Sequence, residues 1–390
     1  MQRERRSKSE SQRSEPATTG WLVPPLLAWF RHNARDLPWR RTTDPYAIWI
    51  SEIMLQQTQV KTVIPYWERW MRELPTVQSL VRARPERVLK LWEGLGYYTR
   101  ARNLQRAAAA IVTEHAGRFP NAFDEVLALP GIGRYTAGAI CSIAFNQPVP
   151  ILDGNVVRVL ARLFGIREHP REKDANARFW KLAETLVREA ARARRGRFRN
   201  CSDLNQALME LGAIVCTSRQ PNCPACPVRK KCVARREGRT AELPALGRMQ
   251  ASIERRFVAF VVQRKGRFLV RRRSAGVVNG HLWEFPNGEV INGRADIPRL
   301  AREIIGPCRV SLTPCLRLKH TITRYRITVD VFRADVLNAL SIRAPGGRWC
   351  SPSDLEKLAF PSAHRRIVER IGNDLLADPE SVQPPVGGST

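Results

Sequence analysis

Four cysteines stand close together near the middle of the chain and form its densest set of metal-ligating side chains. They are Cys216, Cys223, Cys226 and Cys232, separated by six, two and five residues. Four thiolates at such short spacing suit either a zinc ion or a [4Fe–4S] cluster. Zinc sites usually pair two Cys-x2-Cys knuckles, so the single knuckle here favours iron–sulfur over zinc. The remaining cysteines are scattered, which indicates free thiols in a reducing compartment rather than a disulfide framework.

A second chemical motif lies at residues 129–136, which read Leu-Pro-Gly-Ile-Gly-Arg-Tyr-Thr. Gly131 and Gly133 permit a tight hairpin between two helices, and their amides can approach a phosphate. A helix expected over residues 135–145 follows, and the dipole at its N-terminus favours an anion. An ordinary helical connection would look the same, and it is the basic character of the chain that favours a DNA-binding hairpin.

Two carboxylates are candidates for acid–base chemistry. Glu52 lies in a helix expected over residues 46–63, where mostly apolar side chains surround it one turn away. Such surroundings raise a carboxyl pKa, and a Glu that stays protonated near neutrality can act as a general acid. A buried Glu in a salt bridge is the alternative. Asp153 precedes a helix expected over residues 156–163, and it is either the N-cap of that helix or a carboxylate held at the mouth of a DNA groove.

The elements that must position these groups are mostly helices. From residue 21 to about 211, apolar residues recur with a period near 3.6, and Pro and Gly separate the segments. The clearest helical segments are residues 45–63, 86–91, 101–114 and 174–189. The cysteines close this helical region.

A different pattern begins after a polar stretch near residue 254. Short runs rich in β-branched and aromatic residues occupy residues 257–263, 268–272 and 327–332. We therefore predict five segments: a disordered basic N-terminus at 1–20, a helical domain at 21–234, a linker at 235–254, an α+β domain at 255–371 and a disordered tail at 372–390.

The charge of the chain predicts its partner. The formal net charge is +29, and few acidic residues interrupt the basic ones, which favours nucleic acid over a merely solvated basic face. Runs of arginine occur at Arg192, Arg194, Arg195, Arg197 and Arg199, and again at Arg271, Arg272 and Arg273. No apolar run reaches about 18 residues, so a membrane span is not expected. The expected location is the bacterial cytoplasm at the nucleoid, or the nucleus or mitochondrion of a eukaryote.

Residues 21–232 resemble the helix-hairpin-helix base-excision glycosylases with an iron–sulfur loop, in particular the MutY family of adenine DNA glycosylases. The matching segments are Leu-Pro-Trp-Arg at 37–40, Ser-Glu-Ile-Met-Leu-Gln-Gln-Thr-Gln-Val at 51–60, Gly-Leu-Gly-Tyr-Tyr at 94–98, the hairpin, Leu-Asp-Gly-Asn-Val at 152–156, and the four cysteines. The resemblance implies a mainly α helix-hairpin-helix domain with one [4Fe–4S] cluster at those cysteines, followed by an α+β Nudix-like domain.

The resemblance also implies roles for individual residues. Glu52 is similar to the acid that protonates adenine N7. Asp153 is similar to the carboxylate that stabilises the oxocarbenium-like sugar, directly or through a covalent intermediate. Further matches are Tyr135 and Asn155 around that centre, Leu37, Trp39 and Arg40 in the wall of the adenine pocket, and Gln57 and Tyr97 as residues that wedge into the duplex. Wedging accompanies base flipping, because the glycosidic bond cannot be reached inside the stack.

The residue at position 135 predicts the type of reaction. Related bifunctional enzymes carry a Lys at this hairpin position, which forms a Schiff base and permits strand cleavage. Tyr135 has no amine and cannot form one. A monofunctional glycosylase that leaves an abasic site is therefore expected.

The C-terminal domain resembles the Nudix-like domain of the same family, which reads the 8-oxoguanine opposite adenine; Leu-Trp-Glu-Phe-Pro at residues 282–286 matches its signature. Nudix hydrolases hold Mg²⁺ with glutamates of the pattern Gly-x5-Glu-x7-Arg-Glu-x2-Glu-Glu. Gly288, Arg302 and Glu303 fall in register, but Arg294 replaces the first Glu and Gly-Pro at 306–307 replaces the last pair. Metal binding and pyrophosphate hydrolysis are therefore not expected.

The recognition loop of the family commonly reads His-Thr-Phe-Ser-His, and this chain has His320-Thr321-Ile322-Thr323-Arg324. Thr323 keeps a hydroxyl, whereas Ile322 lacks the aromatic ring and Arg324 replaces an imidazole. The expected partner is double-stranded DNA with adenine opposite 8-oxoguanine or guanine, bound by a monomer. The alternatives are a glycosylase for another base, such as thymine or an oxidised pyrimidine, and a non-catalytic DNA damage binder.

Overall fold

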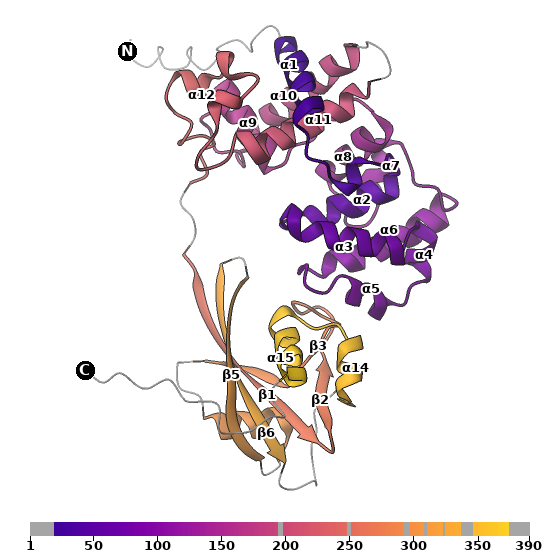
Figure 1. Ribbon diagram of the computed structural model, residues 1–390, viewed down its shortest axis with the longest axis vertical. Helices are drawn as coiled ribbons and strands as arrows, with labels where there is room; N and C mark the ends of the chain where they lie inside the picture. Colours follow the sequence, from indigo (N-terminus) through magenta and orange to yellow (C-terminus); the bar gives the residue numbers. More distant parts are fainter. Residues whose placement is uncertain are drawn as a thin grey trace, which may run out of the picture. The chain divides into compact units, whose positions relative to one another are not determined.

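A computed structural model describes residues 19–193, 198–247, 251–291, 296–307, 310–322, 324–336 and 346–373. The chain divides into two compact units, one formed by Met1–Gln78 with Arg106–Arg248 and the other by Ser79–Gln105 with Met249–Thr390. The first is helical and the second contains the sheet, drawn in orange in Figure 1. Of the predicted disordered ends, 1–20 and 372–390, residues 1–18 and 374–390 lie outside the described residues, as do Arg194, Arg195 and Arg197. Gly20 begins a short helix and residues 372–373 end the last helix, so the two predicted boundaries are wrong by two residues each.

The helical part of the chain contains short helices joined by tight connections. In chain order they are η1 (Gly20–Leu22), α1 (Val23–Asn33), η2 (Pro38–Arg40), α2 (Pro45–Leu55), α3 (Val60–Glu73), α4 (Val77–Arg82), α5 (Pro85–Leu91), α6 (Thr99–Glu114), α7 (Phe123–Ala128), α8 (Arg134–Phe145), α9 (Gly154–Phe164), α10 (Lys173–Arg192), α11 (Asn200–Glu210), η3 (Leu211–Val215), η4 (Cys223–Ala225), η5 (Arg229–Lys231) and α12 (Val233–Arg236). Helices α1, α8, α9, α10 and α11 share one hydrophobic core.

Helix α9 illustrates why these segments are helical. Its apolar residues Val156, Val159, Leu160 and Leu163 recur at helical spacing and are all buried. One stripe of the helix therefore faces the core while the polar residues remain outside. The C-cap is Gly165, whose backbone is left-handed at φ 66°. Glycine takes this conformation at little cost and ends the helix there.

The single helix predicted over residues 45–63 is wrong, because two helices occupy that segment. Helix α2 ends at Leu55 and α3 begins at Val60. Between them Gln57 adopts a left-handed backbone with φ 56°, which an α-helix cannot contain. The apolar period runs on across the break because both helices bury an apolar face, so periodicity alone does not reveal it. The other predicted helices are present with ends shifted by one to three residues.

The second unit is built on a seven-stranded sheet with the order β3-β2-β1-β6-β5, where β4 also pairs with β1 and β7 with β2. The strands are β1 (Ile253–Arg264), β2 (Arg267–Arg272), β3 (Trp283–Glu284), β4 (Asn287–Val290), β5 (Val310–Ile322), β6 (Tyr325–Val336) and β7 (Gly347–Cys350). Strands β1 and β6 run parallel, and the other pairs are antiparallel. The predicted α+β fold is confirmed.

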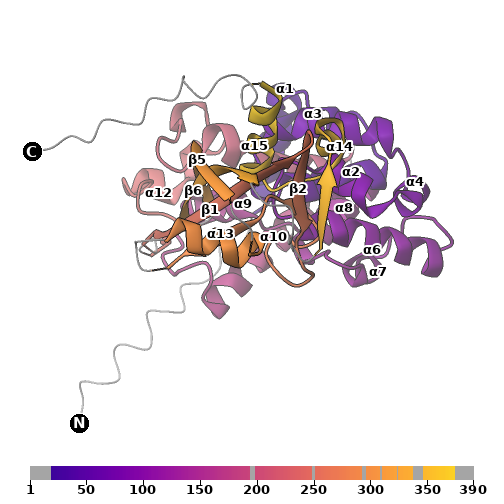
Figure 2. The same ribbon diagram turned by 90° about the horizontal axis from the view of Figure 1, so that it is seen from below.

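Helices cover both faces of this sheet (Figure 2). They are α13 (Ile297–Ile305) on one face, and α14 (Pro352–Lys357) and α15 (Ser362–Asn373) on the other. Successive residues of β1 point to opposite faces. Val258 and Phe260 therefore pack in the core with α13, whereas Ala259 and Val261 pack in the core with α14 and α15.

Residues 79–105, which contain α5 and the start of α6, pack inside the second unit. The carboxylate of Glu93 accepts hydrogen bonds from the backbone N–H of Phe360 at 2.8 Å and from Nε of Arg365 at 2.9 Å. The hydroxyl of Tyr98 donates to the carbonyl of Phe360 at 3.1 Å. The loop at residues 94–98 is thus held by α15 and the segment before it, although it lies far away in sequence.

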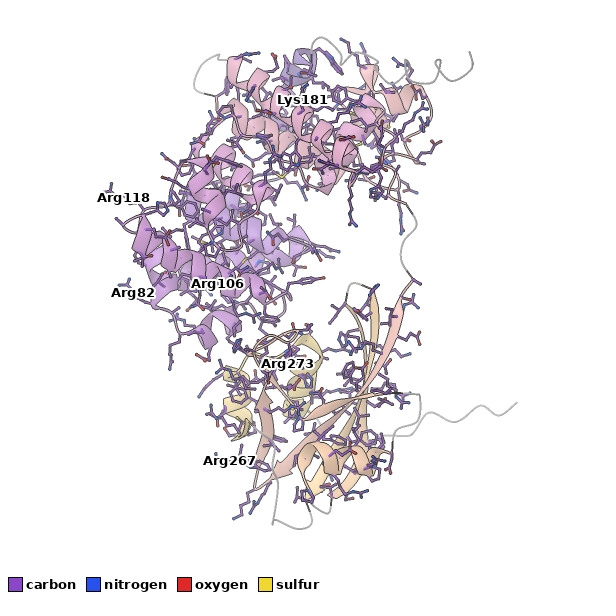
Figure 3. All side chains as sticks on the ribbon, turned by 180° about the vertical axis from the view of Figure 1, so that it is seen from behind. Arg82, Arg106, Arg118, Lys181, Arg267 and Arg273 are labelled. Atoms are coloured by element: carbon purple, nitrogen blue, oxygen red, sulfur yellow. The ribbon has the colours of Figure 1, made fainter. Side chains whose placement is uncertain are left out.

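Exposed basic side chains occur on both units. Those labelled in Figure 3 include Arg106, Arg118 and Lys181 on the first unit, and Arg82 and Arg267 on the second. Their spread matches the net charge of +29 and gives each unit cations for a polyanion. Within the described ranges, no helix is both long enough and apolar enough to cross a membrane.

Candidate active site

The carboxylate of Glu52 lies inside the helical unit, on α2, with 5% of the residue exposed. Its Oε2 accepts a hydrogen bond of 2.8 Å from the hydroxyl of Tyr135 on α8. Burial raises the pKa of Glu52 to about 7 and the nearby charge of Asp153 adds to the rise, while the Tyr135 hydrogen bond and the charge of Arg40 oppose it. The raised pKa predicted from the sequence is confirmed, and the hydrogen bond comes from a neutral hydroxyl instead of the cation of a salt bridge.

Asp153 is the N-cap of α9, as one of the two sequence interpretations predicted. Its Oδ1 accepts the backbone N–H of Val156 at 2.8 Å, and its Oδ2 accepts the side-chain amide of Asn155 at 2.9 Å. Burial raises the pKa of Asp153, and these hydrogen bonds oppose the rise. The cap lies close enough to Glu52 for its charge to act on that carboxyl. The second interpretation, a carboxylate at the mouth of a DNA groove, stays a prediction.

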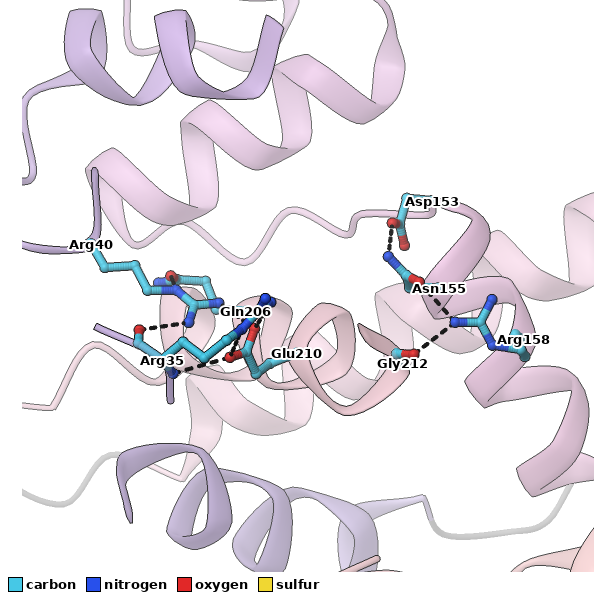
Figure 4. Close-up of polar contacts among 8 residues, drawn as sticks. All are labelled: Arg35, Arg40, Asp153, Asn155, Arg158, Gln206, Glu210 and Gly212. Atoms are coloured by element: carbon cyan, nitrogen blue, oxygen red, sulfur yellow. Dashed lines mark hydrogen bonds and ion pairs between the residues drawn. The ribbon is translucent and has the colours of Figure 1, made fainter. Parts of the chain in front are cut away.

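A chain of hydrogen bonds leads from Asp153 through Asn155 to Arg158 (Figure 4), and Arg158 in turn binds the backbone of the first cysteine. The guanidinium of Arg158 donates to Oδ1 of Asn155 at 2.8 Å, to the carbonyl of Gly212 at 2.7 Å and to the carbonyl of Cys216 at 2.8 Å. A Cβ at Gly212 would lie 2.6 Å from the Cβ of Asn155, so only glycine lets the two segments approach this closely. The sequence interpretation named Asn155 but missed Arg158, which carries the connection.

Arg40, on η2, is held by three hydrogen bonds. They run from its Nε to the side-chain oxygen of Gln206 at 3.1 Å, from Nη1 to the carbonyl of Arg35 at 3.0 Å and from Nη2 to Oε2 of Glu210 at 2.9 Å. Glu210, at the end of α11, is 1% exposed. Sequence reasoning missed Arg35, Gln206 and Glu210; the one available signal for Glu210 was its place on the buried face of a helix.

Leu37 and Trp39, the other residues assigned to the base pocket, are each 6% exposed. Trp39 packs edge-on against Trp67, with the ring centroids 6.0 Å apart. The hydroxyl of Tyr135 also lies 3.3 Å from the sulfur of Met209, on α11. Helices α2, α8 and α11 with η2 thus bring Glu52, Tyr135 and Arg40 into one region.

The hairpin at residues 129–136 connects α7 to α8, as predicted. Gly131 has a left-handed backbone with φ 79°, which glycine takes without strain. Gly133 differs from the expectation that both glycines serve the tight turn: its φ of −101° suits any residue, and it forms the N-cap of α8. A Cβ at Gly133 would meet no atom within 4 Å, so the space before this helix N-terminus is open.

The residues assigned to insertion into the duplex and to recognition of the opposite base are divided between the two units. Gln57 is exposed in the first unit, whereas Tyr97, 44% exposed with φ 47°, and His320 on β5 belong to the second. Tyr97 and His320 thus belong to a different unit from Glu52. Burial lowers the pKa of His320. Thr323 lies outside the described residues.

The four cysteines line one cavity between α9 and the loop that follows η3. The cavity is completed by apolar side chains of the same region, Val159, Leu163, Leu211 and Val215. Nη1 of Arg162, a residue 2% exposed, lies 3.4 Å from Sγ of Cys216, and its guanidinium donates to the carbonyls of Thr217, Ser218 and Leu243. In the part of the chain that the structure describes, no three His, Cys, Asp or Glu side chains are placed to hold a single metal ion.

The Nudix-like signature of the second unit has a structural use. Glu284 of β3, 4% exposed, pairs with Arg271 at 2.8 Å and also with Arg273. Glu303 of α13 pairs with Arg299 at 3.0 Å. Both glutamates thus form ion pairs with arginines. Arg294 lies outside the described residues.

Comparison with known proteins identifies the class of this fold and site. A family model of the HhH-GPD superfamily of base excision DNA repair proteins matches residues 50–185, and a NUDIX domain model matches residues 257–370. A thermostable thymine-DNA glycosylase of known structure is similar over 56% of this chain and 96% of its own, with a TM-score of 0.50 and 31% identity. The chain is a DNA glycosylase of the helix-hairpin-helix class with a Nudix-like domain.

Full-length relatives identify the family. The chain is 34% identical to the human adenine DNA glycosylase, over 88% of this chain and 72% of the relative. It is 35% identical to the adenine DNA glycosylase of Schizosaccharomyces pombe, over 86% of both chains. The chain belongs to the adenine DNA glycosylase (MutY) family, as the resemblance predicted.

Proposed function

We propose that this protein, acting as a monomer, excises adenine opposite 8-oxoguanine or guanine in duplex DNA. It hydrolyses the N-glycosidic bond and leaves an abasic site. The observation that carries the proposal is a pair of carboxylates: the buried Glu52, with a pKa of about 7, and the partly buried N-cap Asp153. Two carboxylates in different environments can divide acid and charge-stabilising roles between them.

Glu52 supplies the proton in this mechanism. With a pKa of about 7, a substantial fraction of the side chain is protonated at neutral pH. Tyr135 donates to Oε2, which leaves Oε1 as the oxygen that carries the proton toward the base. Transfer to N7 of a flipped adenine lets the bond between C1′ and N9 break, and its electron pair leaves with the base.

Asp153 stabilises the sugar that remains. Its carboxylate is fixed by the backbone of Val156 and by Asn155, so it need not reorganise as positive charge develops on the sugar. Water then adds at C1′ and the abasic site is released. Tyr135 offers no amine for a Schiff base, and this supports a monofunctional reaction without strand cleavage.

The four cysteines are proposed to hold one [4Fe–4S] cluster. Their thiols surround a cavity with apolar walls, and the buried cation of Arg162 lies against Cys216, which suits a cluster of net negative charge. When bound, the cluster supplies a structural or redox-active centre that ties the loop at residues 216–232 together. Purified protein is expected to be yellow-brown with about four irons per chain. Stoichiometric zinc without iron would refute the assignment.

The second unit is proposed to read the opposite base, through His320 and its loop. This assignment rests on the match to a NUDIX domain over residues 257–370 and on the family resemblance of the loop. Exposed basic residues of both units supply attraction to phosphates that is independent of sequence.

The test is a single-turnover assay on duplexes with adenine opposite 8-oxoguanine, adenine opposite guanine, and thymine opposite guanine. Alkali treatment after the reaction reveals abasic sites, and untreated samples reveal strand cleavage. The proposal predicts adenine release that appears as breaks only after alkali. Release of thymine instead would favour the activity named for the structural neighbour. Binding of the duplex without release of any base would favour a non-catalytic DNA damage binder.

A further inference from the structure

Glu210 is a buried carboxylate that takes no part in the mechanism above. It accepts hydrogen bonds from the backbone N–H of Arg35 at 3.0 Å, from Nε and Nη2 of Arg35 at 2.7 Å each, and from Nη2 of Arg40 at 2.9 Å. Figure 4 shows the carboxylate between the two arginines. Burial would raise the pKa of Glu210, but the hydrogen bonds from Arg35 and Arg40 lower it to about 2, so the side chain is an anion at every working pH.

Arg40 is the residue of this network that acts electrostatically on the general acid Glu52. Its charge lowers the pKa of Glu52, and its other donors are fixed by Gln206 and by the carbonyl of Arg35. An arginine beside a general acid has two effects: its donors can orient a base, and its charge favours the ionised, inactive form of the acid. A fixed anion on the far side of the guanidinium preserves the first effect and weakens the second.

We propose that Glu210 is a positioning residue of the base pocket, which holds Arg40 in place and balances its charge beside Glu52. This inference rests on the proposed function and on the family resemblance, which assigns Arg40 to the wall of the adenine pocket. The charged and titratable groups that face Glu52 are Tyr135 from α8, Asp153 at the start of α9 and Arg40 from η2. Arg40 is the only cation of these three, so its counter-charge controls how strongly it affects the acid.

The first experiment compares the wild-type protein with Glu210→Gln in single-turnover excision of adenine opposite 8-oxoguanine between pH 5 and 9. Loss of the anion leaves the charge of Arg40 unbalanced, and the pKa of Glu52 falls. The rate of the variant should therefore decline at lower pH than that of wild type. A displacement of about one pH unit makes the variant roughly tenfold slower on the alkaline side. Binding to a duplex with a non-cleavable adenine analogue should change by less than about threefold, because phosphate contacts dominate affinity.

Asp203 offers a matched control on the same helix. It accepts a hydrogen bond of 3.0 Å from Arg31 and so ties α11 to α1, without contact to Arg40. Asp203→Asn removes an equivalent anion and should leave the pH profile of excision unchanged. Arg35→Gln keeps the ion pair of Glu210 and Arg40. The excision rate of this variant at alkaline pH should therefore stay at or above the wild-type rate. A structural role of the network alone predicts that Arg35→Gln and Glu210→Gln behave alike.

A double substitution tests whether Glu210 acts through Arg40. In an Arg40→Gln background, adding Glu210→Gln should lower the rate little further, because the group that Glu210 positions is already gone. If Glu210→Gln does not fold, Arg35→Gln/Glu210→Gln removes one charge of each sign and takes its place with the same expected displacement. An unchanged pH profile in a folded Glu210 variant, or full additivity with Arg40→Gln, overturns the inference. Wild-type protein that excises no adenine from either mispair refutes the proposed function itself, and the inference falls with it.

Discussion

Glu52 and Glu210 are both almost fully buried in the helical unit, at 5% and 1% exposure, yet they differ in charge. Glu52 receives one hydrogen bond from a neutral hydroxyl, and burial raises its pKa to about 7. Glu210 receives four hydrogen bonds from Arg35 and Arg40, which overcome burial and lower its pKa to about 2. Burial therefore does not decide what a carboxylate can do. The donors around it decide whether it can give up a proton or serves as a fixed anion.

The largest expected effect is on catalysis at the neutral carboxylate. Glu52→Gln keeps the shape of the side chain but removes the transferable proton, so adenine excision should fall by about 10²–10⁴-fold. Asp153→Asn should reduce the rate by a comparable factor, since an amide cannot balance developing positive charge. Single-turnover rates with adenine opposite 8-oxoguanine measure both effects.

Binding of the mismatch is the control for these two variants. Affinity for a duplex with a non-cleavable adenine analogue should stay within about threefold of wild type, because neither substitution changes a phosphate contact. Near-normal turnover in Glu52→Gln would rule out Glu52 as the general acid. Loss of binding together with turnover would mean that the substitution had disturbed the fold.

The next effect is on stability, where the two glutamates should act in opposite directions. The folded-state pKa of Glu52 lies above the ordinary value of 4.5. Burial of its charged form therefore costs no stability below pH 4.5, costs more as the pH rises and reaches its full cost above about pH 7. Glu52→Gln should therefore raise the free energy of unfolding at pH 8 by up to about 3 kcal/mol. The folded-state pKa of Glu210 lies below 4.5, so its contribution is complete above pH 4.5 and is lost as the pH falls toward 2.

Glu210→Gln should accordingly lower the free energy of unfolding at pH 8 by up to about 3 kcal/mol, since it leaves the partly buried guanidinium groups of Arg35 and Arg40 without their anion. Urea unfolding of wild type and both variants at pH 8 measures the pair of effects. Shifts of the same sign in the two variants would contradict the distinction between a neutral acid and a fixed anion.

The smallest expected effect comes from the second unit. His320→Ala should lower the ratio of excision rates opposite 8-oxoguanine and guanine by roughly fivefold, as expected for the loss of one contact worth about 1 kcal/mol. The pH dependence should not change, because Glu52 belongs to the other unit. A point substitution is preferable to removal of residues after 250, since that truncation would also remove the partners of Glu93 and Tyr98. An unchanged ratio would show that His320 does not read the lesion.

Functional groups whose environment is set by residues near them in sequence could be predicted from the sequence. Groups whose partners lie far away in sequence were missed. The environment of Glu52 follows from apolar neighbours one turn away, and the capping role of Asp153 follows from the helix after it. Glu210 could not be found this way, because Arg35 lies 175 residues away and Arg40 lies 170 residues away. Likewise, the left-handed backbone of Gln57 divides a predicted helix without the glycine that usually marks such a break.

The packing of residues 79–105 with the sheet was hidden for the same reason. Helical periodicity assigned this segment to the helical region, and its partners Phe360 and Arg365 follow more than 260 residues later. Periodicity reports which face of an element is buried, but not which element buries it.

The most direct test of the account is the pH dependence of adenine excision by the wild-type protein in single turnover, with Glu52→Gln measured beside it. If Glu52 is the acid, only its protonated form reacts, so the rate should be highest at mildly acidic pH and fall as the pH rises through about 7. The residual rate of Glu52→Gln should show no such limb. A wild-type rate that rises through pH 7, or a limb that persists in Glu52→Gln, would contradict the claim that a buried, protonated Glu52 drives the reaction.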